Sequence, residues 1–276
     1  MSEADDKKDN KEEVLEEGTL VSHLVELRSR LIKAALSVLA IFLCLAPFSG
    51  EVFKIVAQPL MNQMASLGGG DGEQMQMIAT QVAAPFLVPF KTCMWVAMFI
   101  AMPVVIYQVW AFVAPGLYKK EKRFAIPLVV SSILLFYLGV LFAYGVVFPL
   151  MFGFFTAVAP EGVAVMTDIN SYLDFVLVIF FAFGLAFEVP IATVMLVWSG
   201  LTTTESLASK RAYVFLGAFV VGMLLTPPDV ISQTLLAVPV YLLYEVGIVM
   251  SRFMVEKPRQ DEQAKEEADE AGSESA

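Results

Sequence analysis

The stretch His23-Leu24-Val25-Glu26-Leu27-Arg28-Ser29-Arg30-Leu31 leads directly into the first long apolar run of the chain. Leucines recur along it at steps of three and four, which predicts an amphipathic helix whose apolar stripe can lie in a membrane interface. Glu26 and Arg30 stand four positions apart with the acid first, the favourable order for an ion pair along a helix. Arg28, Arg30 and Lys33 should hold the start of the first span on the cytoplasmic side.

The composition is that of a membrane protein. The 276 residues are 58% hydrophobic with a mean hydropathy of +0.70, too apolar for a soluble globular domain. The formal net charge of −10 comes almost entirely from two acidic tails, 1–19 and 252–276, which we expect to be disordered and cytoplasmic. The first twenty residues lack an apolar core, so no cleavable signal peptide is expected.

Between the tails, residues 20–251 are predicted to form a membrane domain with six spans. The predicted spans cover about residues 31–49, 85–113, 124–148, 172–198, 211–226 and 230–250. The last two are short, because the prolines of Thr226-Pro227-Pro228-Asp229 must break the final apolar run.

Orientation follows from the positions of lysine and arginine. Sixteen of the 18 fall on one side, so the positive-inside rule places both termini in the cytoplasm. We therefore predict an all-α integral membrane protein, N-in and C-in. Amphipathic caps lie on its outer face: one at 51–84, broken at Pro59, and another beginning where a helix ends at Pro149.

The inventory of reactive residues argues against an enzyme. His23 is the only histidine, so neither a buried Ser-His dyad nor a multi-histidine metal site can be built. No glycine-lysine nucleotide loop is present, and we expect no metal and no cofactor. Glu188 and Asp229 lie at different predicted depths, which disfavours an intramembrane aspartyl protease. Cys44 and Cys93 are interpreted as small buried hydrophobes.

Glu188 is the residue whose side chain costs the most free energy to place in a membrane, because it lies near the middle of the fourth predicted span beside Pro190. Burial would favour its neutral form. One interpretation is a protonated glutamate that hydrogen-bonds a neighbouring helix. The other is a functional polar patch that faces the protein interior or a water-filled cavity.

Two further segments have two interpretations each. The loop from Tyr118 to Arg123 can be a topology anchor, yet Glu121, one acid among four bases, offers two acceptor oxygens suited to a guanidinium. Near the turn of the terminal hairpin, polarity beside Asp229 can be purely structural. Alternatively, side chains there can hydrogen-bond an incoming partner helix; the candidates are Met223, Thr226 and Gln233.

The opening stretch, together with Phe112-Val113-Ala114-Pro115-Gly116-Leu117-Tyr118 followed by Glu121, resembles the TatC family of the twin-arginine translocase. The resemblance extends over roughly residues 20–253. It implies a receptor that binds twin-arginine signal peptides of folded proteins. With single-span TatA-type and TatB-type subunits, such a receptor exports them across the bacterial cytoplasmic (inner) membrane, using the proton-motive force. A multimeric complex in contact with membrane lipid is implied, without nucleic acid.

The resemblance also assigns roles to particular residues. Signal-peptide binding is implied for Glu26, Arg28, Phe112 and Glu121. Partner-helix docking is implied for Met223, Thr226 and Gln233, and an outer-face structural role is expected for Pro59 and Asp229. Glu188 is expected to face a concave membrane cavity. The alternative function from another class is a proton-coupled small-solute transporter that uses Glu188.

Overall fold

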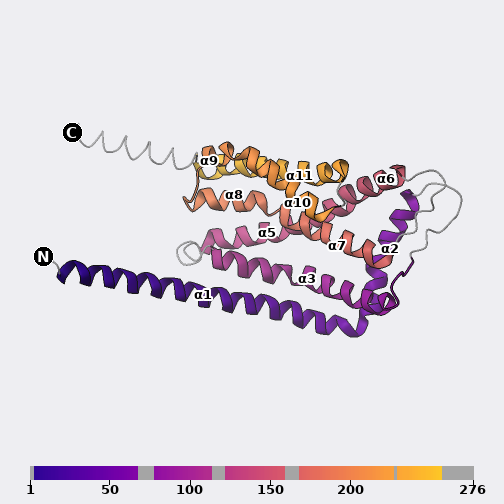
Figure 1. Ribbon diagram of the computed structural model, residues 1–276, viewed down its shortest axis with the longest axis horizontal. Helices are drawn as coiled ribbons and strands as arrows, with labels where there is room; N and C mark the ends of the chain where they lie inside the picture. Colours follow the sequence, from indigo (N-terminus) through magenta and orange to yellow (C-terminus); the bar gives the residue numbers. More distant parts are fainter. Residues whose placement is uncertain (1–2, 68–77, 114–121, 159–167, 227–228, 257–276) are drawn as a thin grey trace. The chain divides into compact units, whose positions relative to one another are not determined.

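The computed structural model describes residues 3–67, 78–113, 122–158, 168–226 and 229–256. These residues are helical and contain no strand beyond an isolated bridge between Ile78 and Asp168. In chain order (Figure 1) the elements are α1 Glu3–Leu45, the 3₁₀ turn η1 Ala46–Phe48, α2 Ser49–Leu67, α3 Ala84–Val113, α5 Lys122–Phe142, the π-helical turn η2 Ala143–Val147, α6 Phe148–Val158, α7 Ile169–Ala186, α8 Val189–Trp198, α9 Thr204–Ser209, α10 Arg211–Leu225, α11 Val230–Ser251 and the π-helical turn η3 Arg252–Glu256.

Five helical stretches among the described residues are long and apolar enough to cross a membrane. They are His23–Gln58, Ala84–Val113, Ile126–Phe155, Ile169–Trp198 and Val230–Val255. The remaining predicted span corresponds to α10, an apolar helix of only 15 residues. The last helix is longer than the sequence predicts, since it continues through η3 rather than ending at 250.

Helix α1 reaches back to Glu3, through most of the segment predicted as a disordered tail. That segment is rich in glutamate and lysine, which have high helix propensity, so local preference suffices to extend the helix. The side chains of residues 3–22 and all of residues 257–276 lie outside the described part of the chain.

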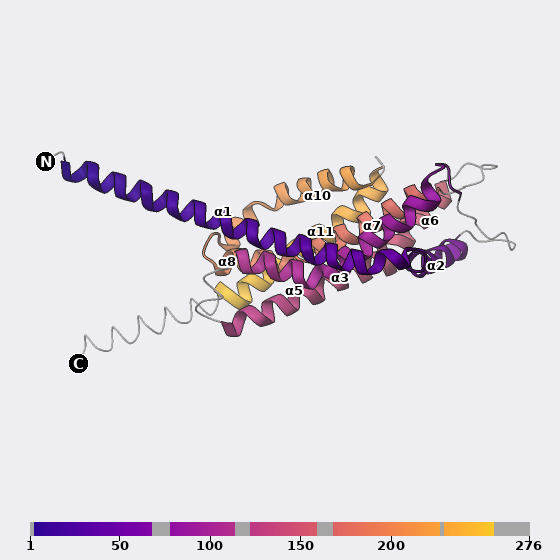
Figure 2. The ribbon, with the colours of Figure 1, turned by 90° about the horizontal axis from the view of Figure 1, so that it is seen from below.

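The chain divides into two compact units, the first made of residues 1–55 and 86–133. In this unit α1 and α3 lie side by side in both views (Figures 1 and 2). A buried hydrogen bond of 2.7 Å from Trp110 Nε1 to Ser132 Oγ joins α3 to α5. Cys93 is buried as expected, but Cys44 is exposed on α1, so the prediction that both are buried is wrong for Cys44.

The second unit comprises residues 56–85 and 134–276. Its α11 packs against both α8 and α10 (Figure 1). Rings from α5 and α6 pack against α7, as in the tilted pair Phe142 and Phe183, with centroids 5.6 Å apart. Glycine permits the closest approaches. A Cβ added at Gly247 on α11 would collide with Thr193 Oγ1 and lie 2.9 Å from Pro190 Cα.

Prolines shape these helices without always ending them. The helical path from α5 continues past Pro149 into α6, so the end predicted there is wrong. The π-helical turn η2 precedes Pro149, whose missing N–H leaves the Gly145 carbonyl without its usual donor. Helix α2 likewise continues through Pro59 to Leu67, against the predicted break. By contrast, α7 and α8 are separated just before Pro190, which cannot donate to the Ala186 carbonyl.

Candidate functional site

The predicted ion pair on α1 is present in the structure. Arg30 donates to a single oxygen of Glu26, Oε1, from Nε at 2.9 Å and from Nη2 at 2.5 Å. The exposed fractions of the two side chains are 24% for Arg30 and 38% for Glu26, so the pair is open to an incoming ligand. The four-residue spacing places both groups on one helix face, which is why local sequence sufficed to predict it.

Two contacts join this face of α1 to the carboxyl-terminal part of α3. The ring of His23 stacks on that of Phe112, with centroids 4.4 Å apart and planes at 24°. One turn earlier on α3, Gln108 accepts a hydrogen bond of 3.5 Å through Oε1 from Arg30 Nη1. The structure therefore gathers Glu26 and Phe112, two of the predicted peptide-binding residues, at one end of the α1–α3 pair.

The other two predicted peptide-binding residues stand differently. Arg28 is exposed on α1, two positions from both Glu26 and Arg30 and hence turned away from their face. Glu121 lies outside the described residues, as does most of the loop from Tyr118 to Arg123.

Gln108 was not among the residues selected from the sequence. A signal for it existed, because Gln108 and Phe112 are four apart near the end of an apolar helix and so share a face. What the sequence lacked was the pairing of that face with α1, which joins residues 78 positions apart.

Glu188 lies at the junction of α7 and α8, within the candidate span Ile169–Trp198. Its backbone N–H donates to the Leu185 carbonyl, and its own carbonyl accepts from Ala192, so a single hydrogen-bonded turn at 187–188 links α7 to α8. The side chain is half-buried. The residue therefore lies at an irregularity beside Pro190 that divides the predicted span 172–198 into two helices.

An apolar cavity of about 570 Å³ lies between α7, α10 and α11. Phe181, Ala182 and Ala186 line it from α7, and Gly217 and Val221 from α10, with almost no polar surface. Glu188 is not among its lining residues, although Ala186 lies only two positions before it.

The three residues expected to dock a partner helix do not form one exposed surface. Met223 is exposed, whereas Thr226 is buried and its hydroxyl donates to the Gly222 carbonyl of its own helix at 2.9 Å. Gln233 is half-buried, and its backbone packs against Gly222. All three are close to the turn of the α10–α11 hairpin, but only Met223 projects freely from the chain.

Of the two predicted outer-face residues, the structure describes the side chain of Asp229 but not that of Pro59. Asp229 caps the amino end of α11, since its Oδ1 accepts a 2.6 Å hydrogen bond from the Ser232 N–H. Pro59 lies within α2, and its side chain is outside the described part.

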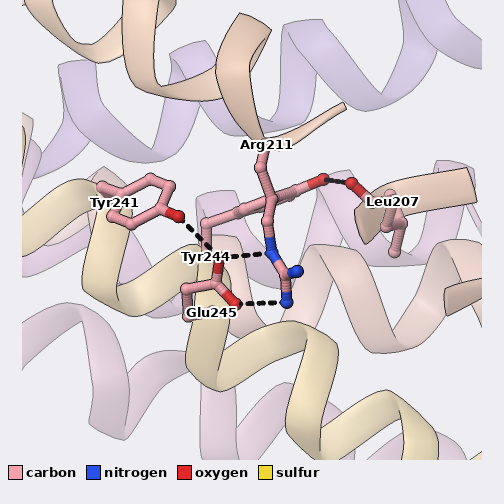
Figure 3. A network of polar contacts seen from close by, with 5 residues as sticks. All are labelled: Leu207, Arg211, Tyr241, Tyr244 and Glu245. Carbon is pink, nitrogen blue, oxygen red and sulfur yellow. Dashed lines mark hydrogen bonds and ion pairs between the residues drawn. The ribbon is translucent and has the colours of Figure 1, made fainter. Parts of the chain in front are cut away.

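A polar network at the opposite end of the same hairpin was missed by the sequence reasoning (Figure 3). The guanidinium of Arg211 on α10 binds both oxygens of Glu245 on α11, at 2.6 Å from Nε and 2.8 Å from Nη2. Tyr241 donates to Glu245, and Tyr244 donates to the Leu207 carbonyl on α9. The signal was the acid Glu245 in the last apolar run and the arginine at the start of the preceding helix, which an antiparallel hairpin brings together.

Asp168 joins the segment before α3 to the start of α7. Its carboxylate accepts from the Thr80 hydroxyl at 2.7 Å and the Thr80 N–H at 3.0 Å, and it also caps α7 through Ser171. These donors, the Thr80 hydroxyl foremost, hold the pKa of Asp168 well below its ordinary value. The carboxylate is therefore ionised throughout the physiological range.

Long apolar helices, an accessible ion pair on α1 beside the carboxyl-terminal end of α3, and a polar clamp in the terminal hairpin together define a helical, multi-span membrane protein. Among the described residues no group of three or more His, Cys, Asp or Glu side chains could hold a metal ion. Residues 22–239 match the TatC family, described as Sec-independent protein translocase protein. The chain belongs to this family.

Relatives of known identity agree with this membership. TatC of Escherichia coli K12 is 54% identical over 244 residues, covering 88% of this chain and 92% of that protein. TatC of Azotobacter chroococcum mcd 1 is 58% identical over 229 residues, covering 83% and 87%. A crystal structure of the twin-arginine translocase receptor TatC matches with a TM-score of 0.70 at 38% identity, covering 84% of this chain and 98% of that one.

The family membership settles the broad class of function. The chain is a component of a protein translocase, a transport protein rather than a catalytic enzyme. Its apolar helices are consistent with a bacterial inner membrane. The comparisons do not favour a small-solute transporter based on Glu188.

Proposed function

We propose that this protein is the core receptor of a twin-arginine translocase. It binds the signal peptides of folded cargo at the cytoplasmic face, and it exports the cargo with single-span TatA-type and TatB-type partners using the proton-motive force. The observation that carries the proposal is the cluster formed by α1 and the carboxyl-terminal end of α3. There a partly exposed carboxylate, Glu26, already binds a guanidinium, and Phe112 lies on the same end.

The chemistry of this end suits an arginine pair. A carboxylate accepts the planar guanidinium fork through charge-assisted hydrogen bonds, and two neighbouring arginines require two carboxylates. Glu26 is the first, and we assign the second to Glu121, which follows α3 in the sequence. We also assign Arg28 to the peptide-binding site, because it lies in the stretch 23–31 that resembles the family motif.

The proposed topology has six spans with both termini in the cytoplasm, α10 crossing as a short helix. The distribution of lysine and arginine supports it, and it places the Glu26 end at the inner surface. A 15-residue helix covers only about 22 Å, so α10 would thin the bilayer locally.

Two further roles complete the proposal. Met223, exposed near the hairpin turn, contacts a partner helix, with Thr226 and Gln233 supporting the turn behind it. Glu188 supplies a polar patch within the concave interior that holds the apolar part of the signal peptide.

The test is site-specific photo-crosslinking between a twin-arginine signal peptide and a probe placed next to Glu121, in membranes containing the full chain. Glu121→Lys should abolish the crosslink while the protein still inserts into the membrane. Glu51→Lys, the same charge reversal at an exposed position in the first turn of α2, is the matched control and should crosslink normally. Undiminished crosslinking in Glu121→Lys would refute the assignment.

A further inference from the structure

The apolar cavity between α7, α10 and α11 is a partly open groove that follows one face of α10. Its lining residues on that helix recur mostly at steps of three and four, from Val214 near the start of α10 to Leu225 at its end. The rise from Val214 to Leu225 is about 16 Å, close to the half-thickness of about 15 Å of a bilayer's hydrocarbon core. The groove thus matches one leaflet in depth.

Contacts near both ends of α10 hold it on α11 and keep the groove open. At the start of α10, Arg211 binds both oxygens of Glu245. Towards its end, a Cβ added at Gly222 would lie 3.7 Å from Gln233 Cα, so the two helices are in direct contact there. Against α7, by contrast, α10 makes few contacts. The space beside Gly217, where no atom lies within 4 Å of an added Cβ, is therefore maintained by the packing of the hairpin.

The groove has to be filled from the surrounding membrane. Water does not fill it, because an apolar lining offers no hydrogen-bond partner, and an empty groove of about 570 Å³ would leave its walls without packing contacts. A helix about 10 Å across and as long as α10 occupies about 1,700 Å³, so it can lie over the groove but not within it. Cavities of about 300–1,000 Å³ hold one small molecule, and a single lipid tail is of this size.

A cation lies at the end of the groove where a lipid headgroup would stand. Lys210 immediately precedes α10 and is four residues before Val214, so it continues the line of groove-lining residues towards the membrane surface. Its side chain is exposed. The neighbouring Arg211 is already paired with Glu245, whereas the Lys210 ammonium projects to the surface, where it attracts negative charge.

We propose that the groove binds an anionic phospholipid of the leaflet in which α10 begins, with one acyl chain between α7 and α10 and the phosphate against Lys210. In the proposed topology this is the cytoplasmic leaflet. The lipid tail gains little hydrophobic free energy on entering, because the bilayer is as apolar as the groove. Selectivity therefore resides in the headgroup, where one lysine at an anionic surface changes binding by about fivefold. This site is separate from signal-peptide recognition at Glu26.

The experiment uses the full chain with its partner subunits in vesicles of zwitterionic lipid. The probe is a trace of phosphatidylglycerol, which is anionic, with a photoreactive group midway along one acyl chain. Phosphatidylcholine with the same chain is the zwitterionic comparison. After illumination, mass spectrometry should locate the label on the groove-lining residues Val178 and Phe181 of α7, with about fivefold more from the anionic lipid.

Variants separate the tail from the headgroup. Gly217→Leu and Ala182→Leu fill the groove from opposite walls, so each should abolish the labelling of Phe181. Gly145→Leu makes the same change at an exposed glycine of the span Ile126–Phe155, with no atom within 4 Å of an added Cβ, and should leave the labelling unchanged. Lys210→Gln should make the two lipids label equally, whereas Lys210→Arg, which keeps the charge, should preserve the preference.

Persistent labelling in both groove-filling variants would overturn the inference, because the label would then come from lipid outside the groove. Equal labelling by the two lipids in wild type would overturn it as well, as would an unchanged preference in Lys210→Gln. Labelling that occurs only when the partner subunits are omitted would show that a partner helix covers the groove, and this outcome too would contradict a bound lipid.

Discussion

The ring of His23 stacks on the ring of Phe112 with centroids 4.4 Å apart, linking α1 to the last turn of α3. His23 is the only histidine of the chain, and here it acts as a flat aromatic surface that fixes a neighbouring ring. Few contacts join α1 to the rest of its unit, since none of its apolar span is buried. The stack therefore contributes much to holding the Glu26 region of α1 against the last turn of α3.

We expect His23→Ala to weaken twin-arginine peptide binding by about two- to tenfold, the range given by an aromatic pair. His23→Phe keeps a ring of similar shape and should bind nearly as wild type. Leu24→Ala, at an exposed neighbouring position, is the control. Peptide titration measures all three, and equal losses in His23→Ala and His23→Phe would contradict a stacking role.

Gly247→Ala should lower the free energy of unfolding by about 1–3 kcal/mol, because the added methyl would collide with Thr193 Oγ1 and crowd Pro190 on α8. Gly217→Ala makes the same change on α10, where no atom lies within 4 Å of the added Cβ, so it should be neutral or slightly stabilising. Thermal unfolding in detergent compares the two. A Gly247→Ala variant as stable as Gly217→Ala would show that α8 and α11 are less closely packed.

The Arg211–Glu245 clamp predicts non-additive effects. Its side chains are 48% and 25% exposed, so solvent screening keeps the ion pair weak, and the Tyr241 hydroxyl adds a further hydrogen bond. Arg211→Ala and Glu245→Gln should each destabilise the chain modestly, and the double variant should cost less than their sum. A double-mutant cycle by denaturant titration tests this, and strict additivity would argue against the pair.

The hydrogen bonds from Thr80 to the Asp168 carboxylate should persist over the whole physiological pH range. Because hydrogen bonding depresses its pKa, the stabilisation is complete above the ordinary carboxyl value of about 4 and is lost only as the pH falls through the lower folded value. Asp168→Asn should therefore loosen the segment around Thr80 at neutral pH, seen as faster hydrogen exchange at residues 78–83. In wild type, exchange protection that disappeared in mild acid would contradict this prediction.

For Glu188, hydrogen bonding rather than charge should matter, because a charge at membrane depth is costly while a neutral polar group keeps its partners. Glu188→Gln should thus retain more transport of a folded twin-arginine cargo than Glu188→Ala. Transport into inverted membrane vesicles measures the difference, with membrane insertion as the control. Equal loss in the two variants would disprove this reasoning.

Much of the helical fold was predictable from the sequence. Apolar runs of sufficient length specify membrane helices, because an unpaired backbone group cannot be left in lipid, and five such stretches are found among the described residues. The details at prolines were less predictable. Pro59 and Pro149 were expected to end helices, yet helix continues past both, since neighbouring turns adjust around a missing N–H more readily than the sequence alone indicates.

The sequence by itself determined the features that depend on near neighbours along a helix: the apolar spans and the Glu26–Arg30 pair four residues apart. Only the tertiary structure decided which distant residues meet. His23 with Phe112, Arg30 with Gln108 and Arg211 with Glu245 each join different helices. The physical reason is that helical periodicity fixes which side chains share a face, whereas the pairing of faces depends on how whole helices pack.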